Sequence, residues 1–505
     1  MGGQCVVCSH DAAKSCSNCK QVYYCNRDHQ AQHWNLHRID CHPFRVNSDK
    51  DRGRFLVATR KIPSGSVLFQ DEPLAIGPFK NHNVTLVCIS CYLPLNNLNN
   101  RCAKCNVPLC SKSCQRQGDH PIECGVLEQV QELKDPAKQF EDWNLILPIR
   151  VLLLKHTDSN KYKNMTSLIS NRPQKETSSD WSELKKSSEL LRNKYKLEID
   201  ENEILDVLCI LDSNSYQVLS KLTFETMSGL YPKAALLNHA CKSNTRPVVT
   251  SQFKMKVVTT ETIEKGMEIS ASYVPPLHTT LQRRAILQRG KFFACTCTRC
   301  SDPTEFGSYS SAIKCHSKGC QGYLVSSNPL GITSEWICSD CQARLDPNTA
   351  IQLDEKLIEE VRKLELQSSG GLASYQKFYD AYRPYLHPNH SFLCLMEQKM
   401  CERIGRVQEM NATNMKVDDW KRKITMAKHL LHTYNLIEAP LSQLTGLICL
   451  ELGEALMAVH MLNEAKQFLE KAIEVFKHED PTSPDGQLQQ KANTLMEVVS
   501  RSHPN

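Results

Sequence analysis

The sequence predicts an α+β protein of several domains that is held together in part by zinc. Its 505 residues exceed what one hydrophobic core organises, so about three or four units are expected. Twenty-one of the 25 cysteines stand in close pairs or beside a suitably spaced histidine, which is the pattern of zinc ligands. Short extended segments occur before position 350, and apolar residues recur at helical spacing after it.

The composition and the N-terminal residues indicate a soluble protein of the cytoplasm, the nucleus or both. The formal net charge of +6 is small for this length, so no nucleic-acid partner is expected. Residues 1–6 lack the basic and apolar segments of a secretory signal. The most apolar run, 145–154, contains Pro148 and Arg150 and is shorter than the ~20 residues of a membrane span. Because thiols stay reduced inside cells, the cysteines indicate metal binding, not disulfides.

The first cysteine and histidine cluster, at 5–41, provides enough ligands for two tetrahedral zinc sites. Its candidate ligands are Cys5, Cys8, Cys16, Cys19, Cys25, His29, His37 and Cys41. His33 is close enough to His29 to compete as a ligand. Tyr24 and Trp34 add aromatic side chains that could line a peptide groove.

An extended stretch at 52–79 precedes a second cluster at 88–124, which repeats the order of the first. Its candidate ligands are Cys88, Cys91, Cys102, Cys105, Cys110, Cys114, His120 and Cys124. Four protein ligands around each zinc leave no open position, so these metals are structural. In such short segments zinc substitutes for a hydrophobic core. Binding of a protein partner is the functional alternative for both clusters.

Helical patterns dominate 126–225, with a polar stretch at 157–179 that we expect to be a loop. Asp180 and Glu183 resemble a capping box at the start of the next helix. Strand patterns return at 246–273. The region 350–505 is predicted to be helical, either as a tetratricopeptide-like array or as an ordinary bundle, because no clean repeat period is present.

Two further cysteine groups follow the strands. Cys295, Cys297 and Cys300 provide three zinc ligands, so the fourth must come from elsewhere. A second group has the two-knuckle spacing of a zinc ribbon and consists of Cys315, Cys320, Cys338 and Cys341. The remaining cysteines are expected to be small core residues, and these are Cys209, Cys394, Cys401 and Cys449.

The string at 229–244 contains Asn238, His239 and Cys241, and it is followed by a segment at 263–273 that ends in Tyr273. With the cysteines at 295–300, these motifs resemble a SET domain and its post-SET zinc site, and the two clusters resemble MYND fingers. The chain is therefore similar to the SET-and-MYND family, in particular to an arthropod-type branch with an extra N-terminal MYND finger.

The resemblance implies a domain order and a zinc pairing. The domains would be a MYND finger at 5–41, a SET domain at 52–87 and 125–290 split by a second MYND finger at 88–124, a post-SET site and zinc ribbon at 291–345, and a helical domain at 350–505. In this family the ligands of the two zinc sites in a MYND finger interleave. The resemblance implies six sets of four ligands, so about six zinc ions would bind. The implied sets are Cys5, Cys8, Cys25 and His29; Cys16, Cys19, His37 and Cys41; Cys88, Cys91, Cys110 and Cys114; Cys102, Cys105, His120 and Cys124; Cys241, Cys295, Cys297 and Cys300; and the ribbon.

The family also implies a β-rich pseudoknot fold and S-adenosylmethionine-dependent transfer of methyl groups to lysine in histone or non-histone proteins. By motif position the cofactor residues would be Arg54, Asn214, Asn238, His239, Tyr273 and Phe293, and Tyr273 would orient the target amine. For Asn214 a helix-end role is the alternative, and for Phe293 a core position is the alternative.

Two departures from the family pattern leave a rival function open. The glycine-rich motif near the cofactor is Gly53-Arg54-Phe55, and Lys291 stands where a tyrosine commonly precedes the post-SET cysteines. The rival is a catalytically weak or inactive SET-fold adaptor, such as a transcriptional corepressor, whose MYND fingers bind proline-rich peptides. In either case we expect a monomer.

Overall fold

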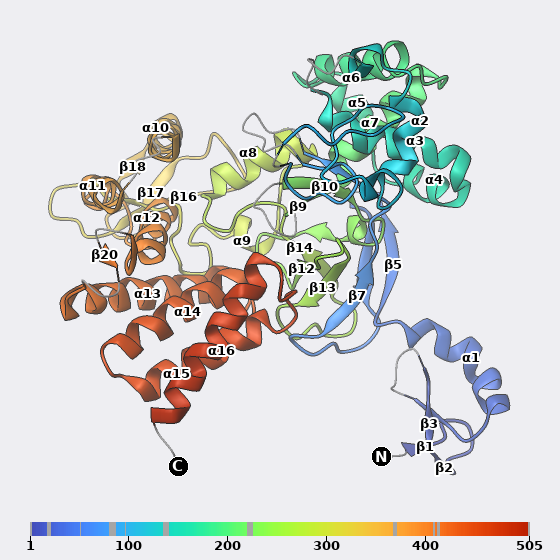
Figure 1. Cartoon of the computed structure of the whole chain (residues 1–505). Coiled ribbons are helices and arrows are strands. Elements are labelled where there is room, and N and C mark those ends of the chain that lie inside the picture. The colour runs from blue at the N-terminus through green and yellow to red at the C-terminus, as the bar shows by residue number, and fades with distance from the viewer. Residues whose placement is uncertain are drawn as a thin grey trace.

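The computed structural model describes residues 3–17, 22–50, 52–79, 87–95, 97–134, 141–219, 226–366, 371–407, 410–411 and 415–502. It confirms an α+β protein that comprises a small N-terminal finger, a helical upper lobe, a central β region and a C-terminal helical region (Figure 1). Within the described residues, no helix combines the length and the apolar character that crossing a membrane requires.

The N-terminal finger consists of short strand pairs and one helix. Asn26 starts this helix, because its side chain accepts a hydrogen bond of 2.8 Å from the His29 amide. The finger stands apart from the rest of the chain, to which β5 connects it (Figure 1). Its elements are β1 (Gly3–Gln4), β2 (Asp11–Ala12), β3 (Lys14–Ser15), β4 (Tyr23–Tyr24) and α1 (Arg27–Cys41).

Three small sheets form the central β region, and each joins a strand from 44–78 to strands from 215–271. Their orders are β11-β14-β6-β5, β12-β13-β7 and β8-β10-β9. The strands are β5 (Phe44–Asp49), β6 (Gly53–Ala58), β7 (Val67–Asp71), β8 (Ala75–Pro78), β9 (Ser215–Leu219), β10 (Thr226–Leu230), β11 (Asn238–His239), β12 (Thr245–Val249), β13 (Met255–Thr259) and β14 (Glu268–Ala271). The extended segments predicted at 52–79 and 246–273 are thereby confirmed, and a shared core that includes Leu56, Val257 and Ile269 lies between the sheets.

The upper lobe, which contains the second finger and the helices up to residue 214, differs from the sequence prediction in two places. The stretch 157–179 is more helical than predicted, and residues 215–219 are not helical. The stretch 157–179 is not a continuous loop, because it contains helix α4 (Ser159–Thr166), which Asp158 caps at the Lys161 amide and whose Met165 is fully buried. Conversely, helix α7 (Glu201–Asn214) ends at Asn214 and β9 begins at once, so the helical prediction for 215–219 is wrong. Residues 220–225 lie outside the described part. The helix after Asp180 is present, but the Asp180 side chain makes no capping bond, so the expected capping box does not form.

The elements of this lobe include the second finger and the helices after it. They are η1 (Ser113–Gln115), α2 (His120–Leu127), η2 (Gln131–Lys134), η3 (Trp143–Leu145), α3 (Ile146–Thr157), α4 (Ser159–Thr166), α5 (Arg172–Lys175), α6 (Trp181–Asn193) and α7 (Glu201–Asn214).

The segment between the central sheets and the C-terminal helices carries the last two cysteine groups. A capping box of Thr279 and Gln282 starts the first helix of this segment. Its elements are α8 (Thr280–Lys291), α9 (Thr298–Ser301) and a four-stranded antiparallel sheet of β15 (Ile313–Lys314), β16 (Tyr323–Ser326), β17 (Trp336–Cys338) and β18 (Arg344–Leu345). The short helix η4 (Ala234–Leu236) precedes this segment and lies between β10 and β11.

The helical prediction after 350 is confirmed. From α13 to α16 each helix packs on the next, as in an array of helical hairpins. Helices α14 and α15 approach closely, because a Cβ on Gly446 or Gly453 would lie 2.6–2.7 Å from side chains of α15. The elements are α10 (Pro347–Leu366), α11 (Leu372–Tyr382), α12 (Ser391–Arg403), β19 (Arg406–Val407), β20 (Met410–Asn411), α13 (Val417–Ile437), α14 (Gln443–Ala458), α15 (Leu462–Phe476) and α16 (Pro484–Ser502). All four cysteines expected in the core are buried.

Polar contacts join the C-terminal helices to the central sheets. Arg246 of β12 forms an ion pair of 2.5 Å with Glu479, and the Ser251 amide donates to Asp480 at 2.7 Å. His478 Nε2 lies 2.7 Å from the carbonyl of Gly65. These contacts hold the turn between α15 and α16 against the edge of the β12-β13-β7 sheet.

Candidate zinc centres and active site

The N-terminal finger brings the ligand atoms of Cys5, Cys8, Cys25 and His29 within 4.8 Å of one another. His29 Nδ1 lies 3.1 Å from the Cys25 sulfur, whereas His33 Nδ1 lies 3.0 Å from the Tyr24 hydroxyl. The structure therefore favours His29 over His33 as the ligand. In the second set, the sulfurs of Cys16 and Cys41 are 3.7 Å apart; Cys19 lies outside the described residues.

The second finger brings together two complete sets of ligands with the interleaved pairing that was expected. One set is Cys88, Cys91, Cys110 and Cys114, and the other is Cys102, Cys105, His120 and Cys124. The Cys91–Cys110 and Cys102–Cys124 sulfurs are 3.4 and 3.7 Å apart. Thiolate and imidazole donors grouped in fours are the set that zinc prefers.

A buried ion pair between Arg150 and Glu123 joins this finger to α3. His120 Nδ1 lies 3.6 Å from the Glu123 carboxylate, and Arg150 binds the same carboxylate at 2.6 and 2.8 Å. Arg150 also donates to the carbonyls of Ile76 in β8 and Ile89 in the finger, each at 2.6 Å. Carboxylates behind a ligating histidine orient its ring. Sequence reasoning missed this role, for which the only signal was a charged residue inside the most apolar run.

Cys241 closes a zinc site with three cysteines from a distant part of the chain. Its sulfur lies 3.9 Å from that of Cys295 and 3.4 Å from that of Cys300, and Cys297 completes the set. Arg283, which is fully buried, points one N–H at the Cys300 sulfur from 3.7 Å. A positive side chain there offsets part of the negative charge of four thiolates.

The ribbon supplies a set of four cysteines in two knuckles: Cys315, Cys320, Cys338 and Cys341. The Gly322 and Asp340 amides donate to the Cys320 and Cys338 sulfurs at 3.3 and 3.4 Å. Such amide donors stabilise thiolates, so the donor chemistry of this site also fits zinc.

The pairing of β11 with β14 assembles the predicted active-site residues. Asn238 and His239 lie on β11, and Tyr273 follows β14. The Tyr273 amide donates to His239 Nδ1 at 3.0 Å, and the His239 ring lies 6.1 Å from the Phe293 ring. Phe293 is 36% exposed, so it is not a core residue. Strand pairing thus gathers three of the six predicted cofactor residues, and the segment after α8 brings Phe293 to them as a fourth.

The other two predicted residues contact a loop that contains part of the stretch 157–179. Arg54 donates to the Ser167 carbonyl at 2.6 Å, and Asn214 donates to the Ile169 carbonyl at 2.7 Å. Asn214 also donates to Ile210 one helical turn before it, at 2.7 Å. In this structure the Asn214 amide group therefore ends helix α7, which is the alternative role that the sequence left open.

Arg52, which sequence reasoning missed, lies beside Asn238. Its guanidinium donates to the Glu268 carboxylate at 2.6 Å, and the Asn238 amide donates to the other oxygen of Glu268 at 3.1 Å. The next residue, Gly53, has φ +65° and open space where a Cβ would point. The arginine next to this glycine was a usable signal, but sequence reasoning chose Arg54 on the other side.

These residues fit S-adenosylmethionine in chemical terms. Arg52 and Glu268 offer both signs of charge, which suit the carboxylate and ammonium of an amino-acid end. The exposed Phe293 ring offers an apolar face.

Asn238→Ala should weaken S-adenosylmethionine binding about tenfold with little change in melting temperature. The Asn238 amide is only part-buried and makes bonds of 3.1 and 3.5 Å within the chain, so its loss costs little folding free energy. Calorimetric titration and thermal melting would measure both. The control is Asn244→Ala, which should lower the melting temperature and leave the cofactor affinity of the folded protein unchanged. Asn244 is buried and forms hydrogen bonds with the backbone of Glu268 and Ser270. A large fall in melting temperature for Asn238→Ala with unchanged affinity would contradict the cofactor role.

Tyr273 and Lys291 lie near each other at this site. The Tyr273 hydroxyl donates to the Leu237 carbonyl, and burial raises the Tyr273 pKa. Lys291 Nζ donates to the Ser213 carbonyl at 2.8 Å and lies 5.7 Å from the centre of the Tyr273 ring. Lys291 therefore lies beside Tyr273.

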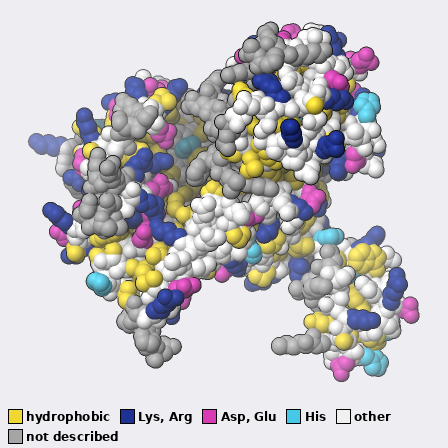
Figure 2. All heavy atoms as spheres, in the orientation of Figure 1, with side chains coloured by type: hydrophobic (Ala, Val, Ile, Leu, Met, Phe, Trp, Pro, Cys, Tyr) yellow, Lys and Arg dark blue, Asp and Glu magenta, His cyan; other side chains and the backbone are white. Residues whose placement is uncertain are grey.

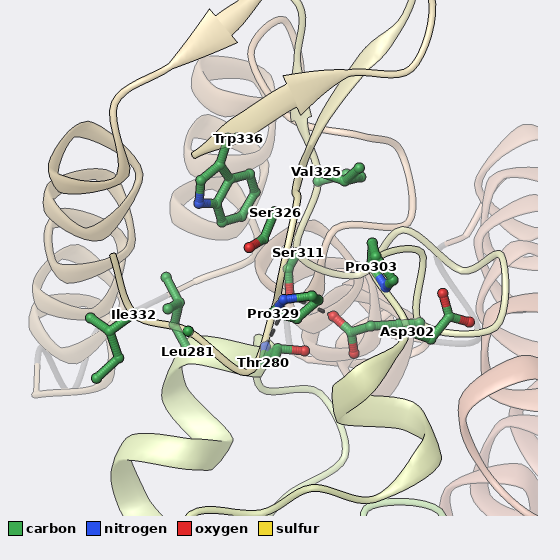
Figure 3. A pocket seen from close by; sticks show the side chains of 13 residues that line it. Thr280, Leu281, Asp302, Pro303, Ser311, Val325, Ser326, Pro329, Ile332 and Trp336 are labelled. Atoms are coloured by element: carbon green, nitrogen blue, oxygen red, sulfur yellow. Dashed lines mark hydrogen bonds between the residues drawn. The ribbon is translucent and has the colours of Figure 1, made fainter. Parts of the chain in front are cut away.

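A small hollow lies elsewhere, between the start of α8 and the zinc ribbon (Figure 3). Leu281, Pro303, Val325 and Trp336 form much of its wall, and none of the predicted active-site residues lines it. On the visible surface, Lys and Arg side chains are interspersed with Asp and Glu (Figure 2), which agrees with the small net charge.

Comparison with known proteins matches a MYND finger at 5–41 and a SET domain at 53–274. The SET domain-containing protein SmydA-8, isoform B, of Drosophila melanogaster is 27% identical over 323 residues, which are 61% of this chain and 69% of that protein. The histone-lysine N-methyltransferase ASHR1 of Arabidopsis thaliana is 22% identical across 86% of this chain and 90% of its own length. The histone-lysine N-methyltransferase SMYD3 of Mus musculus is 28% identical over 50% of this chain and 59% of its own.

Proposed function

The chain is a SET-and-MYND domain protein, and we propose that it transfers methyl groups from S-adenosylmethionine to lysine in histone or non-histone proteins. The SET match and the methyltransferase relatives support this activity. The observation that carries it is the pairing of β11 with β14, which gathers Asn238, His239 and Tyr273. The proposal keeps the domain order predicted from the sequence, with the two MYND fingers, the split SET domain, the post-SET and ribbon segment and the helical domain.

In this proposal the cofactor's amino-acid end is held beside Asn238 by Arg52 and Glu268, and its apolar part lies against Phe293. The bound cofactor supplies a methyl group on a positively charged sulfur. Methyl transfer to an amine is an in-line displacement, so the chain contributes mainly by positioning the reactants.

Tyr273 would orient the target amine. Its hydroxyl proton is directed at the Leu237 carbonyl, so the oxygen lone pairs remain available to accept an N–H from the incoming amine. A lysine attacks only when neutral, and its ordinary pKa is ~10.4. Burial beside apolar and aromatic groups favours the neutral form.

Tyr273→Phe should lower turnover by about tenfold or more, equivalent to ~1.4 kcal/mol of transition-state stabilisation, because it removes only the hydroxyl. Cofactor affinity should remain. Transfer of a labelled methyl group to histones and to a protein extract would measure turnover. The matched control is Tyr231→Phe, which removes a buried hydroxyl that donates to the Phe253 carbonyl at 2.7 Å. Equal turnover in wild type and Tyr273→Phe would contradict the role.

The N-terminal finger provides the proposed binding surface for a protein partner. Trp34 is 43% exposed on α1, which suits stacking against proline-rich peptides. Tyr24 is buried, so the expectation that it shares this surface is wrong. We propose that the protein is a monomer and that it acts in the cytoplasm, the nucleus or both. Peptide binding by this finger, with cofactor bound but no methyl transfer to any acceptor, would favour the adaptor function.

A further inference from the structure

A lysine of the chain itself lies in the acceptor side of the proposed active site. Lys291 is the last residue of α8, and its Nζ donates to the Ser213 carbonyl at 2.8 Å. Ser213 directly precedes Asn214 at the end of α7. The same Nζ lies 5.7 Å from the centre of the Tyr273 ring. The amine is therefore held between two elements that carry predicted cofactor residues.

The surroundings of Lys291 favour a neutral, nucleophilic amine. Burial lowers the pKa of Lys291, since a charged ammonium loses its hydration there. Two charged groups act on it: Asp212 raises its pKa and Lys175 lowers it. Asp212 is engaged by Lys175 in an ion pair, so the acid that would hold Lys291 in its charged form already has a cationic partner. A neutral amine can donate to Ser213 and still present its lone pair.

We propose that Lys291 is itself a methyl acceptor of this active site, modified within its own chain. The inference rests on the proposed function. Nζ forms a bond to the methyl carbon of the bound cofactor while the bond from that carbon to sulfur breaks. The proton that Lys291 gives up on becoming neutral passes to solvent before the transfer. S-adenosylhomocysteine then leaves, and the nitrogen keeps its two protons and takes the positive charge. The methylated ammonium stays next to the Tyr273 ring, where a cation and an aromatic face attract each other.

This modification also bears on other acceptors. The Lys291 amine lies beside the Tyr273 ring, where in this proposal it competes with a substrate lysine for the methyl group. Lys291→Tyr, which restores the residue common in the family, should remove the internal acceptor and raise turnover on external proteins.

The first experiment is peptide mass spectrometry of the full chain after incubation with S-adenosylmethionine. The Lys291 peptide should gain the mass of one or more methyl groups, at a rate independent of protein concentration. Tyr273→Phe should slow this gain, and Lys291→Arg should abolish it. The exposed Lys265 serves as an internal control that stays unmodified.

The second experiment needs no turnover. Acetic anhydride at neutral pH labels amines that are neutral and accessible. S-adenosylhomocysteine should protect Lys291 from this label and leave Lys265 labelled to the same extent. Equal labelling of Lys291 with and without saturating S-adenosylhomocysteine would overturn the placement of its amine beside the cofactor.

The outcomes separate this inference from the proposed function. Methyl transfer to histones or to a protein extract, with no mass gain at Lys291, would overturn the inference and leave the proposed function standing. A mass gain at Lys291 that rises with protein concentration would overturn modification within one chain. No transfer to any acceptor by a protein that binds the cofactor would overturn both.

Discussion

Arg150→Ala is expected to lower the free energy of unfolding by about 3–5 kcal/mol, because it leaves the buried Glu123 carboxylate without its partner. Both side chains are fully buried, and the guanidinium also satisfies the carbonyls of Ile76 and Ile89. These contacts tie the second finger to β8 and α3. The finger should therefore loosen from the SET domain.

Thermal and urea unfolding would measure this loss, and the zinc content would report on the finger. The control is Arg344→Ala, which breaks an exposed ion pair of 2.6 Å with Glu335 and should cost no more than about 1 kcal/mol. Arg150→Met combined with Glu123→Gln should recover part of the stability, since it removes both charges at once. Equal stability of Arg150→Ala and Arg344→Ala would show that the buried pair does not support the fold.

Cys241→Ser should remove one zinc ion and unfold the post-SET segment. Elemental analysis of the wild type should find about six zinc ions, as the cysteine and histidine sets imply. Serine is a poor zinc ligand, and loss of one ligand from a structural site removes the folding free energy that the metal provides. Lys291, Phe293 and the nearby wall of the active site depend on this segment, so cofactor affinity should fall as well.

Cys209→Ser is the matched control for the zinc measurement. Cys209 is equally buried but lies in α7, outside the ligand sets of the described residues. Its replacement should leave the zinc content unchanged and lower stability only modestly. Unchanged zinc in Cys241→Ser would reject the shared site of Cys241 with the cysteines at 295–300. A wild-type count of three or fewer would reject the ligand assignments as a whole.

The sequence by itself determined the features that depend on near neighbours in the chain. Both cysteines of a knuckle such as Cys5 and Cys8 come from one tight turn, so their spacing reveals the ligand without knowledge of the fold. The C-terminal helices were equally visible, because one face of each helix must be apolar to pack on the next. The motif around Asn238 and Tyr273 indicated the family, and the resemblance to the family implied the residues of the cofactor site.

Only the tertiary structure decided the features that depend on contacts across the chain. The choice of His29 over His33, the place of Arg52 beside Asn238 and the helices in the stretch 157–179 follow from neighbours that local pattern does not show. In the sequence, Arg150 is only a charged residue that interrupts an apolar run. In the structure it is buried and donates hydrogen bonds to β8 and to the second finger. In the sequence, Lys291 is a departure from the tyrosine that is common in the family. The structure adds that its amine donates to the carbonyl of Ser213 in α7. A buried polar side chain takes its role from its partners, and here the partners are brought together by strand pairing and helix packing between segments far apart in sequence.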